Sequence, residues 1–98
     1  MLVVTSNHQD MMNKIDVQVP QSITVRQARE QLIRLGLLAQ VQVEIDAIQD
    51  PMQKDIVQNY WEYSIDFKRD NELLIGLASS LGLTSLDLDT MFIEASKL

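Results

Sequence analysis

The sequence is missing several residue types and patterns that particular kinds of chemistry require. It contains no cysteine, so disulfide bonds and thiol catalysis are excluded. Its three glycines, Gly36, Gly76 and Gly82, are scattered along the chain, and none forms part of a glycine-rich loop that could bind phosphate groups. No apolar run approaches the ~18 residues of a membrane-spanning helix. We therefore expect neither a membrane span nor a nucleotide-binding loop.

Basic residues are also scarce. Eight Lys and Arg stand against 14 Asp and Glu, which gives a formal net charge of −6. Because affinity for nucleic acid rests largely on basic side chains that neutralise phosphates, this charge argues against nucleic acid as a partner. The only histidine, His8, has no second ligand at metal-binding spacing. No metal, cofactor or catalytic site is predicted, and the chain is not expected to be an enzyme.

The remaining composition is that of one globular domain, with 46% hydrophobic residues in a chain of 98. Residues 1–21 differ from the rest because two β-type runs, 2–5 and 15–19, occur there. They predict an N-terminal arm, which is either a β-hairpin or one strand with a flexible segment. Unpaired strand edges readily pair with a second copy, so the arm could also mediate a homo-oligomer.

Residues 22–98 are predicted to form a helical domain. Thr24 and Gln27 have capping-box spacing, and Gly36 follows as a left-handed C-terminal cap, so these positions bound a first helix. Its inner stripe is expected to contain Val25, Ala28, Leu32 and Leu35. A second, shorter helix carries the apolar set Leu38, Val41, Ile45 and Ile48.

A third helix is predicted over residues 51–68, with Pro51 at its first position and Asp50 as a possible cap. Its inner side is expected to contain Met52, Ile56, Tyr60, Ser64 and Phe67, flanked by Val57, Trp61 and Ile65. This assignment also places Glu62, Asp66 and Asp70 on one helix face. A divalent-ion or acid–base site there is conceivable, but a solvated face of mixed charge is the ordinary interpretation.

Two further helices complete the predicted bundle of four to five short helices. Asp70 is expected to cap the fourth, which ends at Gly82, and Thr84 or Ser85 caps the fifth. The stretch from Leu77 to Phe92 has the spacing of a DNA-binding helix-turn-helix. A recognition helix presents basic or amide side chains to DNA, whereas the fifth helix carries Asp87, Asp89 and Glu94. A tight corner in a helical bundle is therefore favoured, and a nucleic-acid-binding regulator is the alternative.

Five residues are candidates for protein contacts. Arg26, Arg29 and Arg34 form a basic cluster, which is either a solvated helix face or a patch that binds an acidic partner. Trp61 and Tyr63 are two positions apart on a helix, so both cannot point inward. The exposed member of this pair is a candidate interface anchor, because Trp and Tyr are enriched at binding hot spots.

The helical part of the chain contains four stretches, in order, that can be compared with known proteins: "TVRQAREQLIRLGLLAQV", "IDAI", "WEYSIDFKRDNELL" and "LASSLGLTSLDLDTMFIEASKL". From Thr24 onward the chain resembles a group of small proteins encoded by tailed bacteriophages and prophages, often near tail genes. That group often has proline where this chain has Glu72, and the first twenty residues have no counterpart in it. The resemblance implies a phage or prophage origin, with a location in the bacterial cytoplasm or on the virion. It implies no enzyme activity.

Together these observations predict a mainly α fold with a β-prone N-terminal arm or hairpin. The expected function is a non-catalytic protein-interaction module of phage or prophage origin, such as a virion or tail assembly accessory. The expected partner is a protein.

Overall fold

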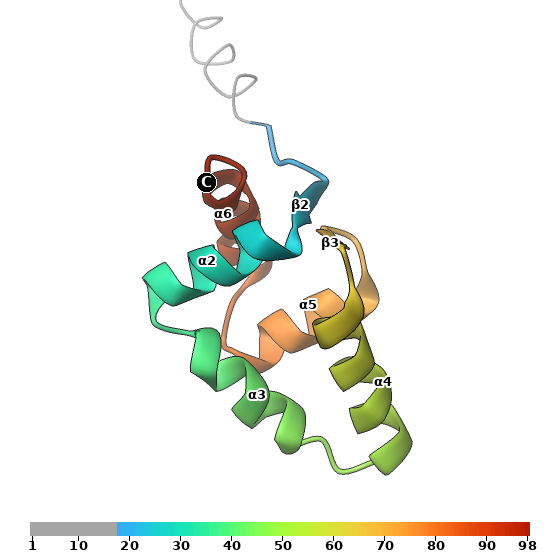
Figure 1. Ribbon diagram of the computed structural model, residues 1–98. Coiled ribbons are helices and arrows are strands. Elements are labelled where there is room, and N and C mark those ends of the chain that lie inside the picture. The colour runs from blue at the N-terminus through green and yellow to red at the C-terminus, as the bar shows by residue number, and fades with distance from the viewer. Residues whose placement is uncertain (1–17) are drawn as a thin grey trace, which may run out of the picture.

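The helical periodicity that begins near Thr24 produces helices. The computed structural model describes residues 18–98, and these residues form five helices: α2 (Val25–Leu35), α3 (Leu38–Asp46), α4 (Pro51–Tyr63), α5 (Glu72–Ser80) and α6 (Ser85–Ala95) (Figure 1). The predicted small, mainly α fold is confirmed. Most of the predicted N-terminal arm, with its first β-type run and His8, lies outside the described residues. Gln18 and Val19, at the end of the second β-type run, belong to neither of the two strands within residues 18–98.

The predicted helix starts follow from side-chain capping. The Thr24 hydroxyl accepts from the Gln27 backbone N–H at 3.1 Å, and the Gln27 side chain accepts from the Thr24 N–H at 2.9 Å. Thr84 and Asp87 form the same reciprocal box at the start of α6. These bonds satisfy backbone donors that have no partner within the helix.

Two of the predicted caps differ from the structure. Asn71, and not Asp70, caps α5, since its Oδ1 accepts from the Leu73 N–H at 2.8 Å. Asp50 precedes α4 at the cap position, but its side chain makes no capping hydrogen bond. Pro51 stands at the first helical position, where its fixed φ suits a helix start and its missing N–H leaves one backbone donor fewer to satisfy.

The two Leu-Gly-Leu corners share one geometry. Gly36 and Gly82 have φ angles of 73° and 84°, which lie in the left-handed region that favours glycine, so the left-handed cap predicted at Gly36 is confirmed. At each corner the amide after the glycine donates to the carbonyl five residues earlier, from Leu37 to Leu32 at 2.8 Å and from Leu83 to Ala78 at 2.9 Å. This is the Schellman arrangement, which ends a helix and redirects the chain sharply.

The prediction of a third helix over residues 51–68 is wrong at its C-terminal end. α4 stops at Tyr63, and residues Asp66–Lys68 form strand β3, which pairs antiparallel with β2 (Ser22–Thr24). Ile23 lies opposite Phe67 in this short ribbon, and both side chains are buried. The backbone bond from Arg69 N to Gln21 O, 2.9 Å, continues the pairing past the strands.

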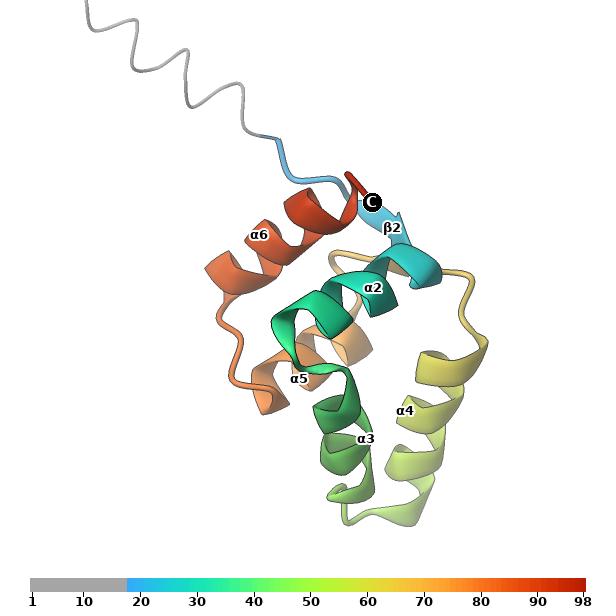
Figure 2. The ribbon, with the colours of Figure 1, turned by 60° about the vertical axis from the view of Figure 1, so that its left-hand side comes forward.

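The core lies between the ribbon and all five described helices. Phe67 is fully buried, and its ring stacks on Trp61 with centroids 5.6 Å apart. Among the described elements, α2 packs closely on α6 and α3, and α3 packs on α4 and α5. Figures 1 and 2 both show α4 at the edge of the molecule, on the side away from α6. One long side of α4 is therefore left without a neighbouring described element.

Candidate interaction surface

α4 carries apolar side chains on two separate faces. Its inner face buries Val57 and Trp61 in the core. Six exposed residues form what we call the outer face of α4: Met52, Asp55, Ile56, Asn59, Glu62 and Tyr63. Their spacing of three and four residues aligns them along one side of the helix. The three apolar members remain 71%, 45% and 74% exposed at Met52, Ile56 and Tyr63.

The expectation that Met52 and Ile56 point inward is therefore wrong. Both stripes of α4 are apolar, so helical periodicity alone does not decide which of them enters the core. The structure places Val57 and Trp61 inward because they meet Phe67 and the other helices there. A signal for the correct choice was present in the sequence, since Asp55 and Glu62 lie between the residues of the outer stripe. Charged residues are seldom buried without a partner.

Of the two aromatic candidates, Trp61 is buried, with 6% of its surface exposed, and Tyr63 is on the surface, with 74% exposed. The guanidinium of Arg29 lies over the Trp61 ring, 4.4 Å from its centroid, and its Nη2 donates to the Trp61 carbonyl at 3.1 Å. Arg29 thus covers the buried indole and joins α2 to the end of α4. Tyr63 is the aromatic residue left on the surface.

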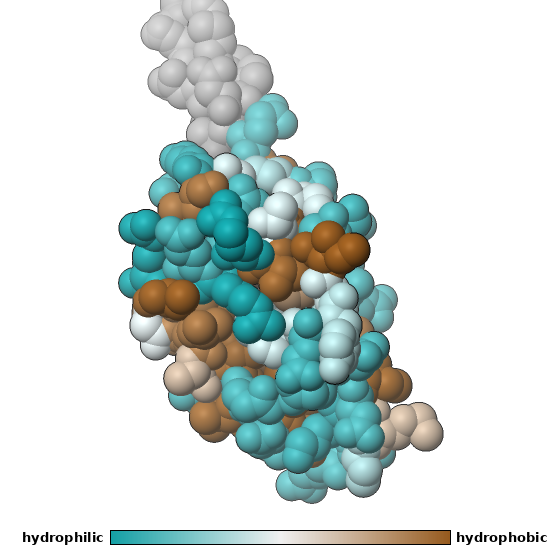
Figure 3. Space-filling view, in the orientation of Figure 1, coloured by the Kyte–Doolittle hydropathy of each residue, from teal (hydrophilic) through white to brown (hydrophobic). Residues whose placement is uncertain are grey.

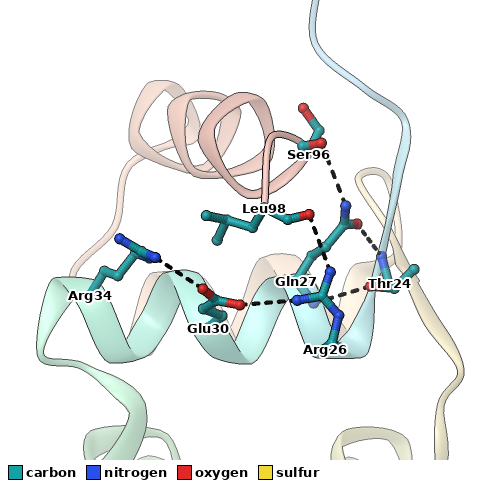
Figure 4. A network of polar contacts seen from close by, with 7 residues as sticks. All are labelled: Thr24, Arg26, Gln27, Glu30, Arg34, Ser96 and Leu98. Atoms are coloured by element: carbon teal, nitrogen blue, oxygen red, sulfur yellow. Dashed lines mark hydrogen bonds and ion pairs between the residues drawn. The ribbon is translucent and has the colours of Figure 1, made fainter.

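The other two arginines of the predicted basic cluster contact their own chain (Figure 4). Arg26 and Arg34 each lie 3.0 Å from a carboxylate oxygen of Glu30, between them on α2. Arg26 also donates to the Leu98 carbonyl at 3.2 Å, which ties α2 to the segment after α6. These contacts offset much of the positive charge of the cluster, although both arginines remain exposed.

The predicted row of Glu62, Asp66 and Asp70 on one helix face is not formed. α4 ends before Asp66, which belongs to β3, and Asp70 lies in the turn before α5. Within residues 18–98, no group of three His, Asp or Glu side chains is placed to hold a metal ion. The reason is the extended backbone at Ser64, which breaks the four-residue repeat.

The segment from Leu77 to Phe92 does contain two helices joined at a glycine corner. However, α6 packs mainly on α2 and β2, and its exposed charges are acidic. Backbone hydrogen bonding from the Thr84 N–H, and then the Thr84 side chain, lower the pKa of Asp87, so this carboxylate stays ionised. Arg69 pairs with Asp89 at 2.7 Å, and Lys97 pairs with Glu94 at 3.3 Å. The basic side chains near α6 are thus held by carboxylates.

A hollow of about 180 Å³ lies between α3, α4 and α5. Val57 and Leu77 give it an apolar floor, and the carboxylates of Glu44 and Glu72 also line it. Gly76 borders the same hollow, and a Cβ atom at that position would meet no atom within 4 Å. The hollow beside α4 therefore combines an apolar floor with carboxylates from α3 and α5.

Comparisons of the chain with protein-family models, with curated proteins and with solved structures gave no match. Within residues 18–98, no helix has the length and apolar character that crossing a membrane requires. A function is therefore inferred from the surface that the chain itself presents, and the outer face of α4 is the largest set of aligned exposed apolar side chains on one described helix.

Proposed function

We propose that this chain is a non-catalytic protein-interaction module of a tailed bacteriophage or prophage, acting as an accessory to virion or tail assembly. The phage context rests on the sequence resemblance from Thr24 onward. The interaction role rests on the outer face of α4, where Met52, Ile56 and Tyr63 are exposed in one line along a rigid helix.

The stability of the fold does not require apolar residues at these three exposed positions, because the inner face of α4 already packs against the core. Burying one such side chain against a partner would contribute about 1.5–3 kcal/mol before the costs of association. The three anchors lie on one side of the helix, two on adjacent turns and the third two turns further on, an arrangement with which helices bind grooves and other helices. In Figure 3, a few hydrophobic residues project at the outer edge of the molecule where α4 lies, among hydrophilic ones.

The surface can be tested by site-specific photo-crosslinking in phage-producing bacterial cells. A photoreactive benzoylphenylalanine in place of Asn59 sits at the centre of the outer face and leaves the three apolar residues intact. A matched probe in place of Thr90, which is exposed on α6, serves as the control. We expect a discrete protein adduct from position 59 and none from position 90. Adducts from position 90 alone would contradict the proposal and favour a role for α6.

A further inference from the structure

The charges around the outer face of α4 indicate the chemistry of its partner. From Leu38 to Tyr63, which we call the α3–α4 hairpin, the chain carries five acidic side chains and one basic residue, Lys54, a net charge of −4. α2, by contrast, carries three arginines and one glutamate. Residues 64–98 carry six acidic and three basic side chains, a net charge of −3 over a longer stretch. The α3–α4 hairpin is therefore the most negatively charged part of residues 18–98 for its length, and two of its carboxylates, Asp55 and Glu62, lie on the outer face of α4.

The two carboxylates on the outer face have no partner within the described part of the chain. Several other acidic side chains are paired with basic ones: Glu30 with two arginines, Asp89 with Arg69, and Glu94 with Lys97. Asp55 and Glu62 make no ion pair or side-chain hydrogen bond with any of residues 18–98. Each lies next to an apolar anchor, so a partner that covers the anchors would bring its own charges close to them.

A second copy of the chain is poorly suited to this surface. Asp55 and Glu62 are seven residues apart, two helical turns, and therefore lie on the same edge of the outer face. In an antiparallel twofold pairing of α4 with its copy, equivalent edges meet. Carboxylates would then face carboxylates across the interface, where like charges oppose binding.

We infer that the outer face of α4 binds a basic amphipathic helix of another protein, whose apolar side chains cover Met52, Ile56 and Tyr63 and whose Lys or Arg residues pair with Asp55 and Glu62. A helix fits because the anchors follow a straight helical line with the spacing of helix–helix packing. This inference rests on the proposed function and specifies the partner class for the same surface.

Two synthetic helical peptides test the inference with the full-length chain. Both have leucines on one face over about five turns, and the remaining positions are lysine in one peptide and glutamate in the other. We expect the lysine peptide to bind with a Kd in the micromolar range that weakens at higher salt, and the glutamate peptide to bind at least about tenfold more weakly.

Variants then locate the binding site. We expect Ile56→Gln to weaken binding of the lysine peptide by about tenfold, and Asp55→Asn with Glu62→Gln to weaken it several-fold and reduce its salt dependence. A control that removes two carboxylates outside the α3–α4 hairpin, Asp70→Asn with Glu94→Gln, should change binding less than twofold. All of these positions are exposed, and thermal unfolding of each variant confirms that it folds.

Several results would overturn the inference. They are no binding of the lysine peptide at about 1 mM, equal binding of both peptides, or binding that the α4 variants leave unchanged. A dimer of the chain that Tyr63→Gln disrupts would assign the surface to a second copy. If crosslinking from position 59 captures a partner whose contact region is neutral or acidic, the proposed function stands and this partner class is wrong.

Discussion

Among individual side chains, Tyr60 has the least favourable surroundings. Its hydroxyl is buried and has no hydrogen-bond partner within residues 18–98. Burial, and then the negative charge of Asp66, raise the pKa of Tyr60 to about 12. The folded chain therefore holds this proton more tightly than the unfolded chain, whose tyrosine has an ordinary pKa of 10.0. Stability that is fully present below pH 10 is lost as the pH rises to about 12.

Tyr60→Phe is expected to remove this contribution to alkaline destabilisation. At neutral pH the variant should be as stable as the unmodified chain or more stable by up to about 1 kcal/mol, because it removes an unsatisfied polar group. Chemical denaturation at several pH values between 8 and 12 provides the measurement, with Tyr63→Phe on the surface as the control. An unchanged pH profile for Tyr60→Phe would contradict the assignment.

Gly76 and Gly82 are expected to respond differently to substitution. Gly82 has a positive φ, so Gly82→Val should lower the unfolding free energy by more than about 1–2 kcal/mol. Gly76 lies inside α5 with open space around it, so Gly76→Ala should raise stability by about 0.5–1 kcal/mol. Denaturant titration of both variants checks this, and similar changes at the two positions would refute it.

Among the helices and strands, the end of α4 separates the features that the sequence could predict from those that it could not. Caps and corners were predictable because Thr24, Gly36 and Gly82 act through bonds to residues a few positions away. The strand at Asp66–Lys68 was not, because its partner, Ser22–Thr24, lies far away in the sequence. Over so few residues, the apolar positions Ile65 and Phe67 fit a strand and also continue the helix.

The same limit applies to the candidate surface. The sequence indicated that only one of Trp61 and Tyr63 could be buried, but it could not say that Trp61 would meet Phe67 and Arg29. Met52 and Ile56 were assigned to the core because their spacing is helical. Which apolar stripe is buried depends on packing against other elements, and that information is not local.

The side chain of Arg69 joins the end of β3 to α6. Arg69 Nε donates to Asp89 at 2.7 Å, and its Nη2 donates to the Ser85 carbonyl and hydroxyl at 3.1 and 3.0 Å. The Arg69 side chain is only 14% exposed, so the pair is largely shielded from water. We expect Arg69→Lys to lower the unfolding free energy by about 1–3 kcal/mol, because lysine cannot make all three contacts.

A double-mutant cycle with Asp89→Asn isolates this interaction. We expect a coupling energy above about 0.5 kcal/mol. Additive effects of the two substitutions would show that the pair does not join the ribbon to α6 energetically.

Across the entire described surface, the distribution of charge argues against duplex DNA as the partner. The arginines of α2 contact Glu30, Trp61 and Leu98, and α6 presents carboxylates at the position of a recognition helix. Fluorescence anisotropy at low salt should therefore show at most weak binding of a DNA duplex. A salt-sensitive complex of sub-micromolar affinity would support the helix-turn-helix alternative instead.

The proposed separation of roles between the two faces of α4 is tested by one crosslinking measurement on a triple variant. Met52→Gln, Ile56→Gln and Tyr63→Gln are combined in the chain that carries the photoreactive residue in place of Asn59. We predict that the protein adduct disappears while the unfolding free energy stays within about 1 kcal/mol of the parent chain, because all three side chains are exposed. An adduct that persists at full yield, or a loss of several kcal/mol in stability, would contradict it.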